Sequence, residues 1–282
     1  MQATVDEAVD RYLASVDRAL PGRVSGFYLV GSAALGAFQA GRSDIDFVAL
    51  VDHRLSPAEL ASLNRAQRHL YRAALVESVS SLPWRWPLVC NGVYVLKEDV
   101  ARSPLDVVPL ASHVGGRLTA DAGFDVNPVT WRILAESGIA VRGLAPAKLR
   151  IWRDDAELRR WTLGNLNGYW RRWAGDLRRP GQIAAKALLL RYVAWGVLGT
   201  SRMHYTITTG DIATKTQACT YALGALGSGW QPLLEETRAY WTGASRPQHA
   251  TPRLSRPRVT SDFVLAAINS AAVIAARAGA PI

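Results

Sequence analysis

"GSAALGAFQAGRSDIDFVALV", residues 31–51, is the stretch that decides the fold of this chain. It starts with glycine and serine directly after one apolar run, "VSGFYLV", and it ends in another that opens with Asp44 and Asp46. Both apolar runs predict β-strands, so the quoted stretch contains the loop that joins them. Alternate side chains of a strand share a face, and we therefore expect Asp44 and Asp46 to point one way while Ile45 points into the core.

The aspartate end of this loop suits a metal ion, and its glycine-serine end suits the phosphate groups of the same ligand. Two carboxylates so close together repel each other unless a cation lies between them, and Mg²⁺ takes oxygen ligands of this kind beside substrate phosphates. Small residues such as Gly31 and Ser32 at the end of a strand let backbone N–H groups approach phosphate oxygens. The alternative is a glycine-containing turn followed by an edge strand with two solvent-facing aspartates.

The spacing of apolar residues divides the chain into an α/β part and a helical part. The first part is expected to contain helices at 4–20 and 56–75 and strands at 24–31, 44–51 and 88–96. The second is helical almost throughout, with helices expected at 155–174, 181–199, 211–226, 230–241 and 260–278, and the Pro-rich residues 242–261 are expected to form a surface loop. We therefore predict an α/β domain with a mixed sheet and flanking helices at 1–147 and an all-α bundle at 148–282.

The excess of positive over negative charge lies entirely in the second half of the chain. Residues 1–146 hold 14 Lys and Arg against 15 Asp and Glu, whereas residues 147–282 hold 19 against 8. Such a surface attracts a polyanion, either a nucleotide triphosphate or a nucleic acid. The basic residues are scattered over amphipathic helices and no RNA-binding module is recognisable, so no stable nucleic acid partner is expected.

The remaining features of the composition indicate a cytoplasmic protein. Cys90 and Cys219 are too few for a disulfide framework and have no metal-ligand spacing, which predicts two reduced, buried thiols. The N-terminal residues lack the basic and apolar regions of a signal peptide. The apolar stretches 184–199 and 263–280 are interrupted by charged or polar residues, so no membrane span is expected.

The quoted stretch resembles the signature of the nucleotidyltransferase superfamily that includes DNA polymerase β. This resemblance implies that Gly31, Ser32 and Ser43 lie near the triphosphate and that Asp44 and Asp46 bind Mg²⁺. It also implies attack of a hydroxyl on the α-phosphorus of ATP, with transfer of AMP and release of pyrophosphate.

Three further segments are similar to the aminoglycoside adenylyltransferases that modify streptomycin and spectinomycin. They are "WGVLGTSRMHYTITTGDIATKTQACTYAL" at 195–223, "VTWRILAESGIAVRG" at 129–143 and "WQPLLEETRAYW" at 230–241. The resemblance implies that Arg202 and Lys215 contact the β- and γ-phosphates and that Tyr240 lies near the base. It also implies a small-molecule acceptor with a hydroxyl, in an enzyme that we expect to be a monomer or a weak dimer. For Arg202 and Lys215, the alternative is two solvated charges on helix faces.

The third acid of this family, a glutamate on the third strand that acts as general base, has no counterpart. The matching positions are Asn91 and Gly92, neither of which can accept a proton. Three interpretations remain. Another carboxylate could serve, the candidates being Glu77, Glu98, Asp99 and Asp106. The substrate hydroxyl could lose its proton to Asp46 or to a metal-bound water, which we favour. Otherwise the enzyme is slow or inactive.

The streptomycin-binding residues of the family are missing as well. Its acidic residues fall at Leu188 and Tyr192, and His113 stands roughly where a substrate-stacking tryptophan would be. Other acids that could meet a cationic acceptor are Asp154, Asp155, Glu157 and Asp176. The acceptor is therefore expected to differ from streptomycin. A catalytically degenerate nucleotide-binding homologue and an RNA-directed nucleotidyltransferase are the alternative functions.

Overall fold

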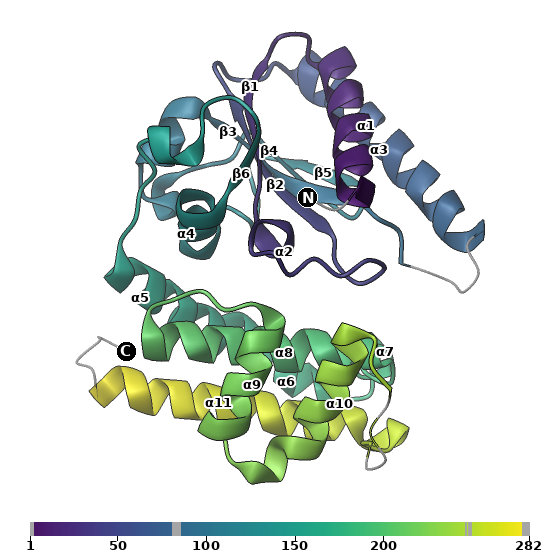
Figure 1. Cartoon of the computed structure of the whole chain (residues 1–282), viewed down its shortest axis with the longest axis vertical. Coiled ribbons are helices and arrows are strands. Elements are labelled where there is room, and N and C mark those ends of the chain that lie inside the picture. Colours follow the sequence, from purple (N-terminus) through teal and green to yellow (C-terminus); the bar gives the residue numbers. More distant parts are fainter. Residues whose placement is uncertain (1–2, 81–85, 246, 248–249, 278–282) are drawn as a thin grey trace. The chain divides into compact units, whose positions relative to one another are not determined.

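The computed structural model describes residues 3–80, 86–245, 247 and 250–277, and the chain forms two compact units. The first is Met1–Arg153 and the second is Asp154–Ile282 (Figure 1). The change from α/β to all-α structure falls in the segment between Lys148 and Asp155, where a short 3₁₀ turn ends and helix α5 begins.

The first unit is built on a mixed sheet of six strands in the order β5-β4-β3-β2-β1-β6. Strands β2 and β3 are parallel and every other neighbouring pair is antiparallel. The strands are β1 (Val24–Leu29), β2 (Ile45–Val51), β3 (Cys90–Leu96), β4 (Ala111–Val114), β5 (Arg117–Ala120) and β6 (Ile139–Arg142). The predicted fold class of this part, a mixed sheet with flanking helices, is confirmed.

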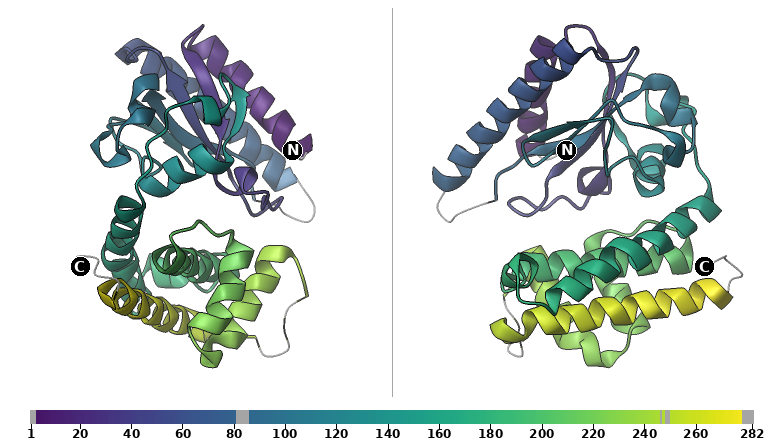
Figure 2. Two further views of the ribbon diagram at one scale, coloured as in Figure 1. Left: turned by 60° about the vertical axis from the view of Figure 1, so that its left-hand side comes forward. Right: turned by 180° about the vertical axis from the view of Figure 1, so that it is seen from behind.

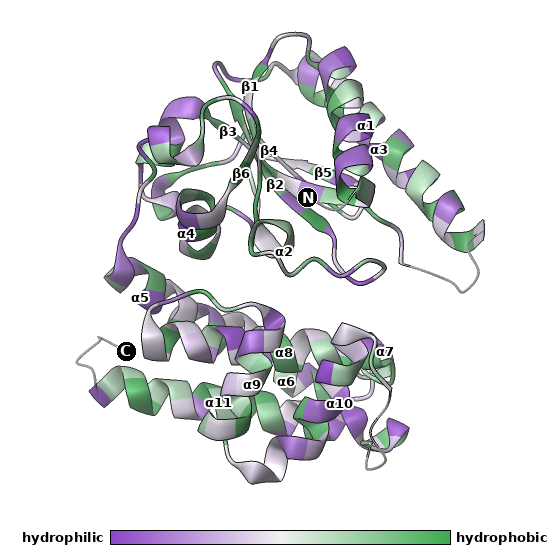
Figure 3. Ribbon diagram, in the orientation of Figure 1, coloured by the Kyte–Doolittle hydropathy of each residue, from purple (hydrophilic) through white to green (hydrophobic). Residues whose placement is uncertain are grey.

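Helices lie on both sides of this sheet. Helices α1 (Ala3–Ala19) and α3 (Pro57–Ser80) lie on one side and α4 (Pro128–Ser137) on the other (Figures 1 and 2). Helix α1 buries Val5, Val9, Tyr12 and Val16, which recur every three or four residues and form a core with strand residues such as Phe47. Figure 3 shows hydrophilic and hydrophobic residues alternating along α1, as expected for a helix with one buried face.

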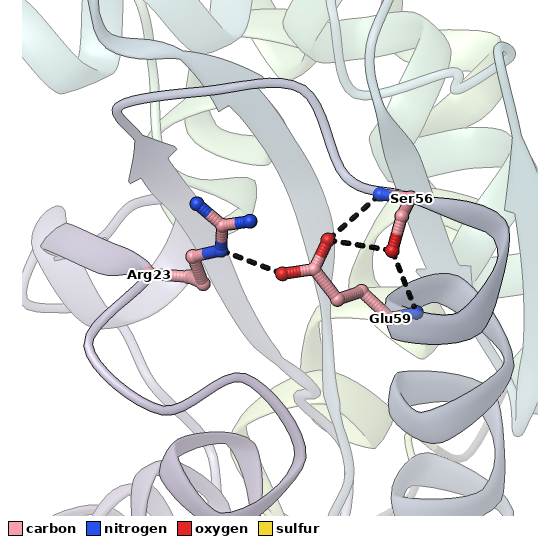
Figure 4. Close-up of polar contacts among 3 residues, drawn as sticks. All are labelled: Arg23, Ser56 and Glu59. Atoms are coloured by element: carbon pink, nitrogen blue, oxygen red, sulfur yellow. Dashed lines mark hydrogen bonds and ion pairs between the residues drawn. The ribbon is translucent and has the colours of Figure 1, made fainter.

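A capping box fixes the start of α3, as the serine at its N-terminus predicts. The backbone N–H of Ser56 donates to Oε2 of Glu59 at 2.8 Å, and the N–H of Glu59 donates back to Oγ of Ser56 at 3.3 Å (Figure 4). Nε of Arg23 donates to Oε1 of the same carboxylate at 2.6 Å. The Ser56 hydroxyl also donates to Oε2 at 2.8 Å. The Arg23 bond, followed by the bonds from the N–H and the hydroxyl of Ser56, lowers the pKa of Glu59 to about 2.

The second unit is a bundle of helices around an aromatic core. Its helices are α5 (Asp155–Asn165), α6 (Arg171–Leu177), α7 (Gln182–Lys186), α8 (Leu190–Thr209), α9 (Lys215–Ala225), α10 (Gln231–Thr242) and α11 (Arg256–Arg277), and a π-helical turn, Leu166–Trp170, joins α5 to α6. Trp170, Trp173 and Trp241 are buried in this core, which supports their role as packing anchors. Trp195, by contrast, is 38% exposed.

Two predicted boundaries in this unit are wrong. The helix expected at 181–199 is interrupted after Lys186, and α8 starts afresh at Leu190 and continues to Thr209. The interruption coincides with a tertiary contact, in which Nη1 of Arg256 donates to the carbonyl of Leu188 at 2.9 Å. The expected surface loop at 242–261 ends early, since α11 already begins at Arg256. Residues 246, 248 and 249 of that loop lie outside the described part of the chain.

Buried polar groups connect the helices of this unit. Glu236 is fully buried, and its carboxylate accepts bonds from Nη2 of Arg256 and from the N–H of Thr251, both at 3.0 Å. His204 lies between Tyr221 and Ser270, with each ring nitrogen 2.9 Å from a hydroxyl. Burial lowers the pKa of His204 to about 4, so its ring is neutral. These contacts link α8, α9, α10 and α11.

Within the described part of the chain, one helix is long and apolar enough to cross a membrane by length and composition. It spans Arg253–Arg277, and an 18-residue window of it has a mean hydropathy of 1.6. Its apolar residues include Phe263, Val264, Ile268 and Ala271, which are fully buried in the core of the second unit. This packing is that of a core helix, in which the apolar face is covered by the protein itself.

Candidate functional site

The glycine-serine end of the quoted stretch lies directly against the aspartate end. Gly31 has φ +58° and starts the short helix α2 (Gly31–Ala34) immediately after β1. A Cβ atom at this position would stand 2.0 Å from Oδ2 of Asp46, so only glycine fits here. The backbone N–H of Val30 also donates to the carbonyl of Asp46 at 2.9 Å. The two halves of the motif therefore form one local structure.

The strand places Asp46 as the alternation of side chains predicts. Ile45 is fully buried in the core beneath α1, while Asp46, one residue further along β2, is half-buried on the opposite face of the sheet. Asp44 is half-buried and lies just before the strand begins. The pKa of the Cys90 thiol is raised to about 12, first by burial and then by the negative charges of Asp46 and Asp44.

Ser43 holds the loop that leads into this pair. Its hydroxyl accepts a hydrogen bond from the N–H of Gln39 at 3.0 Å, and its own N–H donates to the Gln39 carbonyl at 2.8 Å. The side chain is 8% exposed. These bonds close a turn directly before Asp44, so Ser43 fixes the approach of the chain to the carboxylates.

The structure distinguishes between the two residues at the position of the missing acid. Asn91 pairs with Asp46 across the parallel strands β2 and β3, so their side chains are neighbours on one face. Gly92 pairs with Phe47, and a Cβ there would stand 2.1 Å from the Phe47 carbonyl. Of the two residues, Asn91 is therefore the one that shares a face with Asp46. Oδ1 of Asn91 accepts a bond from the N–H of Gly115 at 3.0 Å, a contact from the β4–β5 turn that the sequence did not indicate.

The other carboxylates considered as a base are placed elsewhere. Glu77 belongs to α3, on the opposite side of the sheet from Asp46, and pairs with Arg11 at 2.7 Å. Glu98 and Asp99 follow the far end of β3, about 20 Å of strand away from Asn91. Asp106 is exposed in a separate 3₁₀ turn, Pro104–Asp106. None of the four is a strand neighbour of Asp46 in the described register.

His113 is wrong as a substrate-stacking residue. It is 2% exposed and lies on the α1 side of the sheet, with its ring stacked on Tyr12 at a centroid distance of 6.4 Å. Asp46 faces the other side. Burial is the main cause of a lowered pKa for His113, so this imidazole is neutral at pH 7.

In the second unit, two of the three predicted nucleotide contacts, Arg202 and Lys215, lie at the loop between α8 and α9, and the third, Tyr240, lies on α10. Nε of Arg202 donates to the carbonyl of Ala213 at 2.8 Å, and Lys215 begins α9 two residues later. The ammonium of Lys215 lies 3.6 Å from the centroid of the Trp241 ring, next to Tyr240 on α10. The loop and α10 thus hold both cations in defined positions.

The positions at which the family binds cationic streptomycin carry no acid in this fold either. Leu188 and Tyr192 are half-buried, and the ammonium of Lys186 lies 5.8 Å from the centre of the Tyr192 ring. Of the other acids considered, Asp154 accepts the N–H of Glu157 at 2.6 Å as the N-cap of α5. A lysine over Tyr192 makes this surface a poor place for a polycation.

The donor set for a metal ion is limited to the aspartate pair. Within the described ranges, there is no group of three or more His, Cys, Asp or Glu residues that could hold a metal. Two half-buried carboxylates, with Gly31 packed against one of them, suit a hard cation that takes its other ligands from phosphate oxygens and water.

The comparisons with known proteins bear on both units. Residues 183–261 match the sequence model of the aminoglycoside adenylyltransferase C-terminal domain. The structure is similar to spectinomycin adenyltransferase AAD(9) from Enterococcus faecialis, solved with ATP and spectinomycin: the TM-score is 0.65 and the identity 12%, over 92% of this chain and 98% of that one. At this identity the likeness shows the fold. A search of curated proteins finds no match.

These findings confirm the predicted fold class and the resemblance to the nucleotidyltransferases that modify aminoglycosides. In that comparison, the α/β unit and the helical bundle of this chain occur together and in the same order. The chain therefore carries, at residues 183–261, a segment similar to the C-terminal domain of the aminoglycoside adenylyltransferases, in a fold similar to that of AAD(9).

Proposed function

We propose that this protein transfers AMP from ATP to a hydroxyl of a small-molecule acceptor, in a Mg²⁺-dependent reaction. The observation that supports this most strongly is the contact between Gly31 and Asp46, which brings a phosphate-binding turn and a metal-binding carboxylate within one local structure. The solved relative was crystallised with ATP and spectinomycin, and the fold supports a similar use of the nucleotide here.

The residues of the first unit would bind the reacting end of the nucleotide. Asp44 and Asp46 would hold Mg²⁺ together with phosphate oxygens, and the backbone N–H groups of Gly31 and Ser32 would face the triphosphate. The metal would neutralise the negative charge of the phosphates. Ser43 would lie near the phosphates, and its hydrogen bond to Gln39 would fix the loop before Asp44. In the second unit, Arg202 and Lys215 would bind the β- and γ-phosphates, and Tyr240 would lie near the base.

The acceptor hydroxyl would attack the α-phosphorus. A new P–O bond forms, the bond between the α-phosphorus and the bridging oxygen breaks, and pyrophosphate leaves. The hydroxyl proton must pass to a base, and Asn91 cannot take it. Asp46 is the carboxylate beside Asn91 on this face of the sheet, so we assign the proton to Asp46 or to water at the metal site.

The acceptor would be a hydroxylated compound of the antibiotic type, with less positive charge than streptomycin. The family's acidic positions are Leu188 and Tyr192, with Lys186 against the latter, so a compound with several ammonium groups lacks partners there. We further propose that the enzyme acts in the cytoplasm as a monomer or weak dimer, and that its functional domains are residues 1–147 and 148–282.

Pyrophosphate release from ATP tests the proposal directly. The full chain is incubated with ATP, Mg²⁺ and a panel of hydroxylated antibiotics that includes spectinomycin and streptomycin. We expect release with at least one acceptor and a loss of about 100-fold or more in Asp44→Asn and Asp46→Asn. Asp10→Asn, a substitution at an exposed position of α1, should leave the rate unchanged. Release that is unaffected by both active-site substitutions contradicts the assignment.

A degenerate homologue that binds nucleotide without turnover is the second candidate, because Asn91 replaces the expected acid. It predicts that ATP and Mg²⁺ bind with normal dependence on Asp46 while no acceptor supports pyrophosphate release. An RNA-directed activity predicts release only with an RNA 3′-hydroxyl and an affinity that falls steeply with salt. Both outcomes are read from the same assay when an RNA is added to the panel.

A further inference from the structure

The loop that follows β5 and leads into α4 lies on the same face of the sheet as Asp46. A Cβ atom on Gly123 would stand 2.9 Å from Cβ of Ser112 and 3.1 Å from Cγ1 of Val93, so the loop backbone lies directly against these side chains. Val93 is two residues after Asn91 on β3, and Ser112 is its partner on β4. Side chains two residues apart on a strand share a face, so both point to the side of Asp46. The loop therefore covers this face beside the candidate site.

Hydrogen bonds hold this loop in place. Asn127 caps α4, since its Oδ1 accepts a bond from the N–H of Thr130 at 3.0 Å. Its Nδ2 donates to the carbonyl of Phe124 at 2.8 Å and so closes a turn around Asp125. The backbone of Asp125 is therefore fixed between the contact of Gly123 with the sheet and the start of α4.

The carboxylate of Asp125 is half-buried and has no cation beside it. Burial raises the pKa of this carboxyl group above its usual value, and no charged neighbour contributes to the change. Among the residues that the structure describes, none forms a hydrogen bond or an ion pair with this side chain. Its oxygens are nevertheless absent from the buried atoms that lack a partner, so both of them reach the surface and are accessible to a ligand.

A carboxylate in this position suits one positive charge of a ligand. It has lost part of its hydration without gaining a partner, and an ammonium group would supply both a counter-charge and hydrogen bonds. Mg²⁺ would neutralise Asp44 and Asp46, and their strand neighbour Asn91 carries no charge. Asp125 therefore offers an acceptor one negative charge that neither the metal nor the protein uses.

We infer that Asp125 binds an ammonium group of the acceptor whose hydroxyl lies at Asp46, so that the preferred acceptor is a hydroxylated compound with a single amine. This inference rests on the proposed function and names the class of acceptor. Ser112, against which the loop packs, belongs to the second strand from Asp46 and so lies about 10 Å away across the sheet. The hydroxyl and the ammonium would accordingly belong to different ends of the acceptor.

The compounds trans-4-aminocyclohexanol and trans-1,4-cyclohexanediol form a matched pair of probes, since they differ by an ammonium group in place of a hydroxyl. In the full chain labelled with ¹³Cγ-aspartate, the amine should shift the resonance of the Asp125 carboxylate in a saturable manner. The diol is uncharged and should bind at least about 10-fold more weakly. Equal binding of both probes, or no saturable shift with the amine, overturns the inference.

Two variants locate the binding. Asp125→Asn keeps the shape of the side chain and removes its charge, so the amine and the diol should bind this variant equally in calorimetry. Asp121→Asn, at an exposed position of the same loop, is the matched control and should keep the preference for the amine. A preference that survives in Asp125→Asn means that the ammonium binds elsewhere and refutes the site.

Kinetics separate this inference from the proposed function. For an acceptor that carries an amine and supports pyrophosphate release, Asp125→Asn should raise the KM of that acceptor by at least about 10-fold, while the KM of ATP stays within about 2-fold. An unchanged acceptor KM, or a loss of ATP binding instead, refutes the role of Asp125 and leaves the proposed reaction intact. Absence of release with every acceptor refutes the proposed reaction, and the ammonium site is then decided by the two probes.

Discussion

The contact between Gly31 and Asp46 can be tested by adding a single methyl group. In Gly31→Ala, the new Cβ would stand 2.0 Å from Oδ2 and 2.7 Å from Cγ of Asp46. Ordinary contacts begin at about 3.5 Å, so the carboxylate must move by more than 1 Å. The substitution also places an alanine at φ +58°, which costs about 1–2 kcal/mol of folding free energy. We expect a folded but less stable protein in which Asp46 no longer reaches its position beside the turn.

Gly36→Ala is the matched control for this experiment. Gly36 has φ +65°, and nothing lies within 4 Å of the Cβ that alanine would add. It therefore carries the same backbone strain without the collision, so Gly36→Ala should lose about 1–2 kcal/mol in urea unfolding and Gly31→Ala at least as much. The effect of the collision alone is then measured by calorimetry with ATP and Mg²⁺. Gly31→Ala should bind the nucleotide at least about 10-fold more weakly than Gly36→Ala, because displacement of the Asp46 carboxylate should cost over about 1.4 kcal/mol of binding free energy. Equal affinities would show that the Gly31–Asp46 contact has no part in nucleotide binding.

Three further predictions concern the strand neighbour of Asp46 and the buried groups of the second unit. Asn91→Asp keeps an oxygen for the Gly115 N–H and adds a base, so pyrophosphate release should rise about tenfold or more; an unchanged rate means that proton removal is not limiting. The pKa of His204 is about 4 in the folded chain and about 6.5 in the unfolded chain, so the unfolded chain binds more protons between these pH values. The free energy of unfolding should therefore fall by about 2 kcal/mol as the pH drops from 6.5 to 4. The variant His204→Gln should lose this pH dependence in unfolding measurements. Glu236→Gln leaves the buried guanidinium of Arg256 without its counter-charge and should lower the free energy of unfolding by about 3–5 kcal/mol. The adjacent substitution Glu235→Gln should lower it by under about 1 kcal/mol in the same assay.

The elements that the sequence predicts well are those whose pattern is local. Ile45 is buried while Asp46 lies on the opposite face, because side chains alternate on any strand. The start of α3 follows from Ser56 and Glu59, which cap the helix through bonds between residues three apart. Gly31 stands where the first predicted strand ends, and its positive φ is a conformation that glycine adopts without strain.

The features that the sequence does not reveal depend on partners far along the chain. The interruption between α7 and α8 coincides with a bond from Arg256 to Leu188, and these residues are 68 positions apart. The spacing of apolar residues over 181–199 does not reveal the interruption. His113 cannot be assigned to the correct face of the sheet from its neighbours alone, because that depends on the pairing of β4 with β3. The bond from Gly115 to Asn91 requires the same pairing.

The pairing of Asp46 with Asn91 also changes the balance of charge at the candidate site. In the family pattern a third carboxylate stands at this position, and three carboxylates together raise one another's pKa unless more than one cation is bound. Here Asp44 and Asp46 would supply two negative charges and Asn91 none, so a single Mg²⁺ would neutralise the pair. The amide still accepts the Gly115 N–H, which is the structural task of the position, and an acid would perform that task equally well. Asparagine at 91 therefore preserves the β4–β5 turn while it removes both a proton acceptor and a charge. The bond to the Gly115 N–H and the supply of a base are thus separate properties of position 91, and asparagine there keeps only the first.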